Sequence, residues 1–178
     1  GIFNKFNNVL APKPEVFDFL KDVFSELCDL FPGQYIHVGG DECAKRWWQE
    51  SEETQQFMRE HGLKDEKTLQ SYFVHYVQDV VNGKGKTLIG WDEILEGGLA
   101  PNATVMSWRG EKGGIEAAKQ KHDVIMTPNT YLYFDYYQAK DVDNEPFGIG
   151  GYLPLERVYS YEPMPASLTP EEQKYIKG

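Results

Sequence analysis

Basic residues are scarce in this chain: Lys and Arg number 18 against 28 Asp and Glu, which gives a formal net charge of -10. A surface of that sign repels nucleic acid and anionic membranes, so we expect neither as the main partner. No apolar run approaches the roughly 18 residues of a membrane-spanning helix, so no membrane span is expected. With 178 residues, the chain is long enough for one domain with a sizeable core.

Cysteine is scarce as well, with only Cys28 and Cys43 present. Cys28 lies among apolar residues and is predicted to be a small core residue, and a disulfide between the two cysteines stays open. Asp141, Asp143 and Glu145 alternate in a loop, but the spacing and glycine of an EF-hand are absent. We therefore expect no metal site and no cofactor.

Helical and extended patterns alternate along the chain. Apolar residues recur at helical spacing from Pro14 to Phe31, and Pro32-Gly33 ends that predicted helix. This alternation predicts an α/β fold with a parallel sheet and right-handed crossovers. The remaining predicted elements are a buried strand at 35–38, strands at 87–91, 103–108 and 122–128, helices at 47–60, 67–81 and 113–120, an extended stretch at 131–135, a loop at 141–151, an irregular stretch at 156–165 and a helix start at 169–172.

The segment His37-Val38-Gly39-Gly40-Asp41-Glu42 carries the clearest chemical signal. Successive side chains of a regular strand point to opposite faces, so Asp41 and Glu42 are predicted to lie on a turn just past the strand. Gly39 and Gly40 permit the backbone angles of such a turn. Enzymes of parallel α/β architecture keep their chemistry at this end of a strand. Neighbouring carboxylates raise each other's proton affinity, so one stays anionic while the other can donate a proton.

This segment resembles the H-x-G-G-D-E signature of the glycoside hydrolase family 20 β-N-acetylhexosaminidases. Three later segments fit the same family in order, and the resemblance runs from about Phe6 to Pro163. It implies part of a (β/α)8 TIM barrel whose four strands resemble the fourth to seventh, with residues 1–178 forming a single partial catalytic domain. The three segments are Gly90-Trp91-Asp92-Glu93, Ser107-Trp108-Arg109 and Tyr131-Leu132-Tyr133-Phe134-Asp135.

The resemblance implies a retaining, substrate-assisted hydrolysis. Carboxyl groups of ordinary glycosidases stand roughly 5–9.5 Å apart on either side of the scissile bond, which adjacent residues on one turn do not easily achieve. Instead, the carbonyl oxygen of the sugar's 2-acetamido group attacks the anomeric carbon and forms an oxazolinium intermediate. Glu42 would act as general acid and then as base. Asp41 would orient the acetamido group and stabilise the developing positive charge.

The resemblance also assigns substrate-binding residues. Trp91 and Trp108 would wall the pocket for the acetamido methyl, and flat apolar walls exclude water from the intermediate. Tyr133 would donate a hydrogen bond to the acetamido oxygen, and Asp135 would bind a sugar hydroxyl. In an extended segment these two residues would face the same side. The candidates for supporting hydrogen bonds are His37, Asp92, Glu93 and Arg109.

The resemblance further implies a substrate with terminal β-linked N-acetylglucosamine or N-acetylgalactosamine. The family usually works outside the cytoplasm, in the periplasm, in secretions or in lysosomes. Its sugar-clamping arginine is expected upstream of Gly1, and its last-strand tryptophan and glutamate beyond Gly178. Whether residues 1–178 alone are active therefore stays open, and their open sheet edges are expected to invite self-association.

Two alternatives stay open at this point. The first is a sugar-binding module without catalysis, although a pure binder needs no proton donor such as Glu42. The second is a conventional two-carboxylate glycosidase for sugars that lack the acetamido group. Trp47 and Trp48 follow the motif closely, and they could either rim a sugar site or pack the loop onto the domain.

Overall fold

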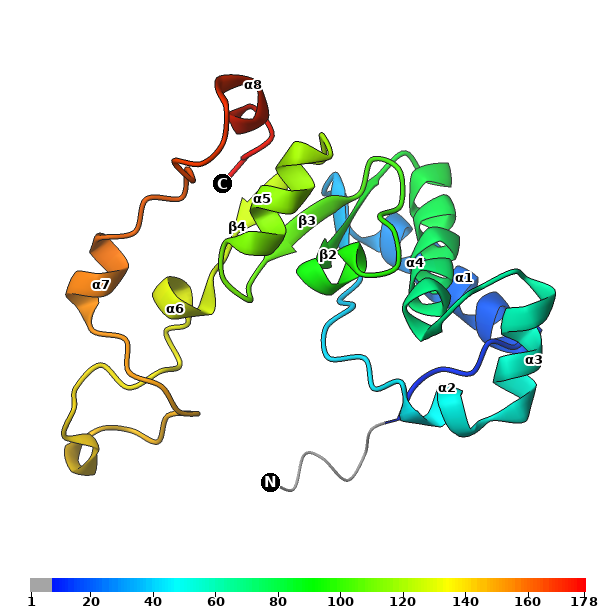
Figure 1. The fold of residues 1–178 in the computed structure, drawn as a ribbon, viewed down its shortest axis with the longest axis horizontal. Helices are drawn as coiled ribbons and strands as arrows, with labels where there is room; N and C mark the ends of the chain where they lie inside the picture. Colours follow the sequence, from blue (N-terminus) through cyan, green and yellow to red (C-terminus); the bar gives the residue numbers. More distant parts are fainter. Residues whose placement is uncertain (1–7) are drawn as a thin grey trace. The chain divides into compact units, whose positions relative to one another are not determined.

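The computed structural model describes residues 8–178 (Figure 1). The chain divides into two compact units, Gly1–Thr104 and Val105–Gly178, and each contains helices and short strands. The four predicted strands are present as β1 (Tyr35–His37), β2 (Thr87–Trp91), β3 (Thr104–Ser107) and β4 (Val124–Met126). Strands β1 and β2 pair in parallel, as do β3 and β4, which confirms the predicted parallel arrangement.

Two long helices lie side by side in the first unit, α1 (Pro14–Leu30) and α4 (Glu66–Gly83) (Figure 1). Helix α1 begins with Pro14, which suits a first turn because its nitrogen carries no hydrogen to satisfy. Its buried Phe17 packs against Phe73 and Tyr76 of α4, with ring centroids 4.9 Å apart in both pairs. The apolar stripe predicted from the spacing is therefore the α1 face that contacts α4.

The prediction of a single helix over residues 47–60 is wrong, because two helices occupy that stretch. They are α2 (Arg46–Glu50) and α3 (Glu52–Glu60), separated by Ser51. Ser51 has an extended backbone, and its hydroxyl accepts a hydrogen bond from the Thr54 amide at 3.2 Å. A serine that caps one helix in this way ends the preceding one, because the cap position is not helical.

Strand β1 pairs with β2 in the register Ile36 to Leu88 and His37 to Ile89. Ile36 is buried, whereas Tyr35 is 54% exposed and His37 is also exposed, so the prediction of a buried strand at 35–38 is right for Ile36 and wrong for these two neighbours. Side chains alternate between the two faces of a strand, and a strand packed on one face buries only every second residue. A 3-10 helix, η2 (Asp92–Leu95), follows β2 at once.

The second unit contains β3, α5 (Lys112–Lys119), β4 and four short helical segments. Strands β3 and β4 pair in the register Val105 to Val124. The helix start predicted at 169–172 is confirmed by a capping box, in which Thr169 and Glu172 exchange side-chain and backbone hydrogen bonds. The short segments are α6 (Asn129–Leu132), η3 (Val142–Asn144), α7 (Leu155–Tyr159) and α8 (Pro170–Gln173).

Two stretches of the second unit differ from the predictions. Residues 129–132 form α6, so the stretch 131–135 is not extended throughout, and α7 replaces part of the irregular stretch predicted at 156–165. Pro128 and Pro154 are the N-caps of these two helices. Proline fixes φ near the helical value and needs no hydrogen-bond partner for its nitrogen, which favours a helix start.

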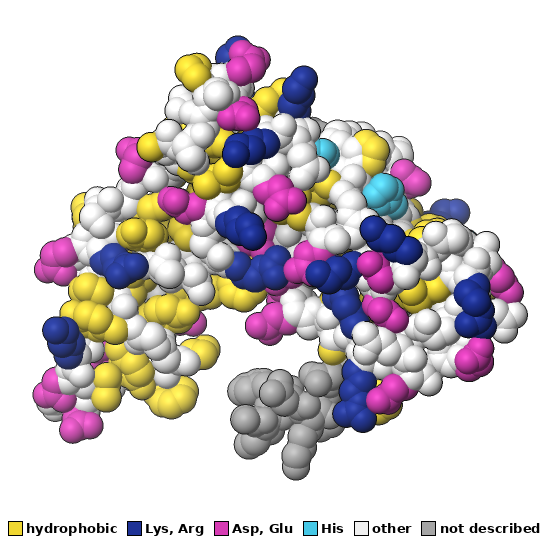
Figure 2. Space-filling model, viewed as in Figure 1, with side chains coloured by type: hydrophobic (Ala, Val, Ile, Leu, Met, Phe, Trp, Pro, Cys, Tyr) yellow, Lys and Arg dark blue, Asp and Glu magenta, His cyan; other side chains and the backbone are white. Residues whose placement is uncertain are grey.

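Exposed apolar side chains are concentrated in the second unit between residues 134 and 159 (Figure 2). Phe147 is 93% exposed and Ile149 is 81% exposed. Cys28 is buried as predicted, and both cysteines are free, so the disulfide left open from the sequence is not formed. Within residues 8–178, no helix combines the length and apolarity needed to cross a membrane.

Candidate active site

The turn after β1 begins where the pairing with β2 ends. The Val38 amide donates to Ile89 O and the Trp91 amide donates to Gly39 O, both at 2.9 Å. Gly39 and Gly40 then take φ values of 74° and 98°, which glycine adopts at little cost. A Cβ at Gly40 would also lie 2.9 Å from Cγ2 of Ile94, so the turn packs closely against η2.

Asp41 and Glu42 lie on this turn and both are exposed, at the carboxyl end of β1 as predicted. Glu42 has a φ of 45°, in the left-handed region that residues with a Cβ avoid. Such a conformation costs about 1–2 kcal/mol and persists where the surroundings hold it. The turn therefore presents two adjacent carboxylates to solvent from a strained backbone.

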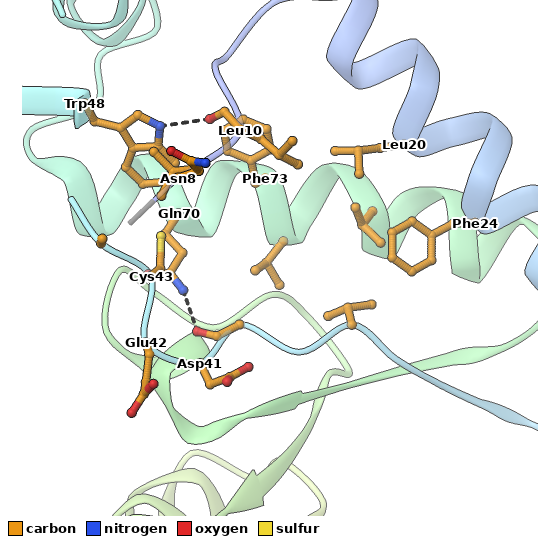
Figure 3. A pocket seen from close by; sticks show the side chains of 16 residues that line it. Asn8, Leu10, Leu20, Phe24, Asp41, Glu42, Cys43, Trp48, Gln70 and Phe73 are labelled. Atoms are coloured by element: carbon orange, nitrogen blue, oxygen red, sulfur yellow. Dashed lines mark hydrogen bonds between the residues drawn. The ribbon is translucent and has the colours of Figure 1, made fainter. Parts of the chain in front are cut away.

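A cavity of about 420 Å³ lies beside this turn in the first unit (Figure 3). Figure 3 shows the Asp41 and Glu42 carboxylates extending from the turn on the side opposite to Trp48, Leu20 and Phe24. The polar ends of the candidate catalytic pair therefore do not point into the apolar part of the cavity. The apolar lining residues are Val9, Leu10, Leu20, Phe24, Val38, Trp48, Phe73, Val74 and Val77.

His37 contacts both the turn and Trp91. Its Nδ1 accepts a hydrogen bond from the Gly39 amide at 3.0 Å, so in the neutral ring the proton is on Nε2. Its ring lies edge-on to that of Trp91, with centroids 4.7 Å apart. Burial lowers the pKa of His37 below its ordinary value of 6.5, and the nearby negative charge of Asp41 opposes this shift. His37, predicted as a supporting residue, thus contacts both Gly39 of the turn and Trp91.

Asp92 and Glu93 are the first residues of η2, directly after Trp91. Asp92 is 2% exposed and Glu93 is 8% exposed. Carboxylates buried to this degree require hydrogen-bonding or charged partners inside the protein, and both have interactions there. Their proposed supporting role remains a prediction.

The second unit brings Trp108 and Tyr133 together. Their rings are stacked, with centroids 6.0 Å apart and an interplanar angle of 12°. The buried Ser107 holds the loop that follows β3. Its hydroxyl donates to Gly110 O at 2.8 Å and accepts from the Gly114 amide at 2.9 Å. This loop carries Trp108 and the exposed Arg109.

Asp135 is exposed, and its carbonyl accepts a hydrogen bond from the Ile149 amide at 3.3 Å. Residues 134 and 135 form a turn, closed by a hydrogen bond from the Tyr136 amide to Tyr133 O at 3.2 Å, so Tyr133 and Asp135 do not share the regular extended segment from which a common side was predicted. Tyr133 instead contacts Tyr136 edge-on, with ring centroids 5.8 Å apart. Trp108, Tyr133 and Tyr136 therefore form one group of aromatic contacts in the second unit.

Trp47 and Trp48 have different environments. For Trp48, they decide between the two alternatives left open, a rim of a sugar site and packing of the loop onto the domain. Trp48 is 4% exposed, stacks on Phe73 with an interplanar angle of 2° and donates from Nε1 to Leu10 O at 2.9 Å. It is a core residue, as the packing alternative predicted. Trp47 is 53% exposed.

The sequence analysis missed two residues that contact the turn, Lys45 and Gln70. Gln70 is 6% exposed, and its Nε2 donates to Gly40 O at 2.7 Å. Its signal in the sequence is an amide within a mainly apolar helix stripe, three positions before Phe73 and seven before Val77. Among residues 8–178, no cluster of three or more His, Cys, Asp or Glu is arranged to hold a metal ion.

Known proteins resemble this chain over most of its length. A β-hexosaminidase of Porphyromonas gingivalis is 56% identical over 169 residues, covering 94% of this chain and 22% of that protein. A β-hexosaminidase of Vibrio furnissii is 37% identical over 162 residues, covering 89% of this chain and 26% of that protein. The chain thus spans about a quarter or less of the length of these relatives.

Solved structures also resemble the chain over most of its length. The family 20 exo-β-N-acetylglucosaminidase from Vibrio harveyi, solved in complex with N-acetylglucosamine, superimposes with a TM-score of 0.78 at 32% identity. That match covers 95% of this chain and 27% of the Vibrio chain. The fold is accordingly part of a (β/α)8 barrel, as the sequence predicted. The model of the glycosyl hydrolase family 20 catalytic domain matches residues 2–178, and the chain belongs to this family.

Proposed function

We propose that the full-length protein removes terminal β-linked N-acetylhexosamine from carbohydrates by retaining, substrate-assisted hydrolysis. The observation that carries this proposal is the turn after β1, where Asp41 and Glu42 stand side by side and exposed at the carboxyl end of a strand. The chain belongs to glycosyl hydrolase family 20, and we propose that an acid and its partner reach the substrate from this turn.

The adjacency of the two carboxylates supports the substrate-assisted route. Two residues on one turn extend from the same side of a sugar ring, whereas a two-carboxylate glycosidase needs groups on both sides of the scissile bond. A nucleophile supplied by the substrate's own acetamido group removes that requirement. Glu42 then protonates the leaving oxygen and later activates water, and Asp41 holds the acetamido group and stabilises positive charge.

The aromatic residues fit the same proposal. Trp91 is the last residue of β2 and contacts His37, and Trp108 stacks on Tyr133 in the second unit. We propose Trp91 and Trp108 as walls for the acetamido methyl, Tyr133 as a donor to the acetamido oxygen and Asp135 as a ligand of a sugar hydroxyl. The substrate class, terminal N-acetylglucosamine or N-acetylgalactosamine, is part of this proposal.

The experiment compares two aryl substrates with the full-length natural protein. It measures release of the phenol from an aryl N-acetyl-β-glucosaminide and from the matching β-glucoside. Turnover of the first alone is the expected result, because only that sugar carries the acetamido nucleophile. Equal turnover of both sugars would support a two-carboxylate glycosidase instead, and binding without turnover would support a sugar-binding module.

A further inference from the structure

The buried amide of Gln70 joins helix α4 to the turn that carries Asp41 and Glu42. Gln70 follows Gly40 by 30 positions in the sequence, and its Nε2 donates to Gly40 O at 2.7 Å (Figure 3). Gln70 is 6% exposed and Gly40 is half-buried, so this hydrogen bond is partly buried. A hydrogen bond whose donor lies in the protein interior holds its acceptor in place.

Gln70 makes a second contact with the same turn through Lys45. The Lys45 amine donates to Gln70 Oε1 at 2.6 Å and also to the Cys43 carbonyl at 2.9 Å. The amide of Gln70 thus uses both its donor and its acceptor. Together these contacts hold the backbone on both sides of Asp41 and Glu42, at Gly40 and at Cys43.

The turn needs this support because of its backbone conformation. Pairing with β2 ends at Gly39, whose carbonyl accepts from the Trp91 amide. Glu42 then takes a left-handed φ of 45°, which a residue with a Cβ keeps only where neighbouring contacts hold it. The hydrogen bonds from Gln70 and Lys45 hold the backbone two positions before Glu42, at Gly40, and one position after it, at Cys43.

We propose that Gln70 is a positioning residue for Glu42: through Gly40 and Lys45 it fixes the turn so that the Glu42 carboxyl meets the leaving oxygen. This inference rests on the proposed function. A general acid acts only within hydrogen-bond reach of the group that it protonates. A displacement of about 1 Å at a reacting group costs roughly 100-fold in rate, so the geometry of this turn controls the rate of cleavage.

The test replaces Gln70 by Leu in the full-length natural protein, which keeps the volume and removes both hydrogen bonds. It measures kcat/KM for two N-acetyl-β-glucosaminides, one with an unactivated phenyl group and one with a dinitrophenyl group. Cleavage of the phenyl glycoside needs protonation by Glu42, whereas dinitrophenolate leaves with little help. We expect Gln70→Leu to lower kcat/KM about 10- to 100-fold for the phenyl substrate and less than about threefold for the dinitrophenyl substrate.

Gln78→Leu is the matched control. Gln78 lies on the same helix, is 3% exposed, and its Oε1 has no hydrogen-bond partner within residues 8–178. Eight residues separate it from Gln70, roughly 12 Å along the helix axis. We expect this variant to leave kcat/KM for both substrates unchanged, because the position of Gln78 on the helix is this far from that of Gln70.

Lys45→Met is a second variant for the case in which Gln70→Leu does not fold. It removes the hydrogen bonds to Gln70 and Cys43, and Lys45 is only partly buried. We expect kcat/KM to fall selectively for the phenyl substrate again, but by a smaller factor than in Gln70→Leu. Equal loss with both substrates, or no loss, would overturn the positioning role while the proposed function stands. No hydrolysis of either substrate by the unsubstituted protein would overturn the proposed function itself, and this inference with it.

Discussion

The ring of His37 lies edge-on against the indole of Trp91, with centroids 4.7 Å apart and an interplanar angle of 61°. The two residues stand at the carboxyl ends of neighbouring parallel strands. Nδ1 of His37 also accepts the amide hydrogen of Gly39, the first residue of the turn that carries Asp41 and Glu42. His37 therefore connects the candidate acetamido wall with the candidate catalytic turn.

The protonation of His37 gives the first prediction. Burial lowers its pKa below 6.5, so the folded protein binds fewer protons at this site than the unfolded chain. The free energy of unfolding is therefore unaffected by His37 above pH 6.5. It falls as the pH drops from 6.5 to the lowered pKa, because the unfolded chain takes up this proton first. NMR titration of the imidazole, identified by comparison with His37→Asn, measures this pKa. A value at or above 6.5 would contradict the expected direction.

The candidate catalytic pair gives the second prediction. Glu42→Gln keeps the shape of the side chain and removes its acidic proton, and we expect kcat to fall by roughly 10²- to 10⁴-fold with an aryl N-acetyl-β-glucosaminide. Asp41→Asn removes the charge that stabilises the intermediate and should lower kcat by roughly 10²- to 10³-fold. Glu53→Gln is the control, because Glu53 is a surface acid paired with Lys13. Full activity of Glu42→Gln would refute the assignment.

The left-handed backbone of Glu42 gives the third prediction. Glycine adopts a φ of 45° without a Cβ clash, so Glu42→Gly should raise the free energy of unfolding by about 0.5–1 kcal/mol while abolishing hydrolysis. Lys121→Gly is the matched control, since Lys121 has a φ of 66° and lies in the second unit. It should stabilise the protein similarly and keep its activity. Denaturant titration and the aryl substrate measure both properties, and a destabilised Glu42→Gly would show that the turn is not strained.

The tryptophan pair gives the fourth prediction. Trp48 is 4% exposed and stacks on Phe73, so Trp48→Ala should lower the free energy of unfolding by about 3–5 kcal/mol. Trp47→Ala should change it by less than about 0.5 kcal/mol, because Trp47 is 53% exposed. Thermal unfolding of the two variants side by side compares them directly. Similar midpoints would mean that Trp48 contributes little to the core.

The exposed apolar side chains of residues 134–159 give the fifth prediction. Phe147 and Tyr159 are 93% and 83% exposed, and apolar surface of this kind favours association. We expect a polypeptide of residues 1–178 alone to self-associate, as the open sheet edges also predict. Light scattering at several concentrations measures this, and a monomer at every concentration would rule it out.

Local patterns in the sequence were sufficient for several elements. The apolar spacing of residues 14–31 predicted α1, and the cap at Thr169 predicted α8, because each signal depends on residues within a few positions of one another. The position of Asp41 and Glu42 past a strand also followed from local rules, since side chains alternate along a strand and glycines permit a turn. The family resemblance rested on the same short segments.

Other features were decided only by the tertiary structure. Trp47 and Trp48 are adjacent and chemically identical, yet only Trp48 packs on Phe73, because the direction of α2 sets which side chain faces the core. Gln70 contacts Gly40 across 30 positions of sequence, and no local pattern encodes a hydrogen bond between residues so far apart. The sequence by itself thus determined the elements and the place of the candidate catalytic pair. The packing of α4 against the turn decided what holds that pair in its conformation.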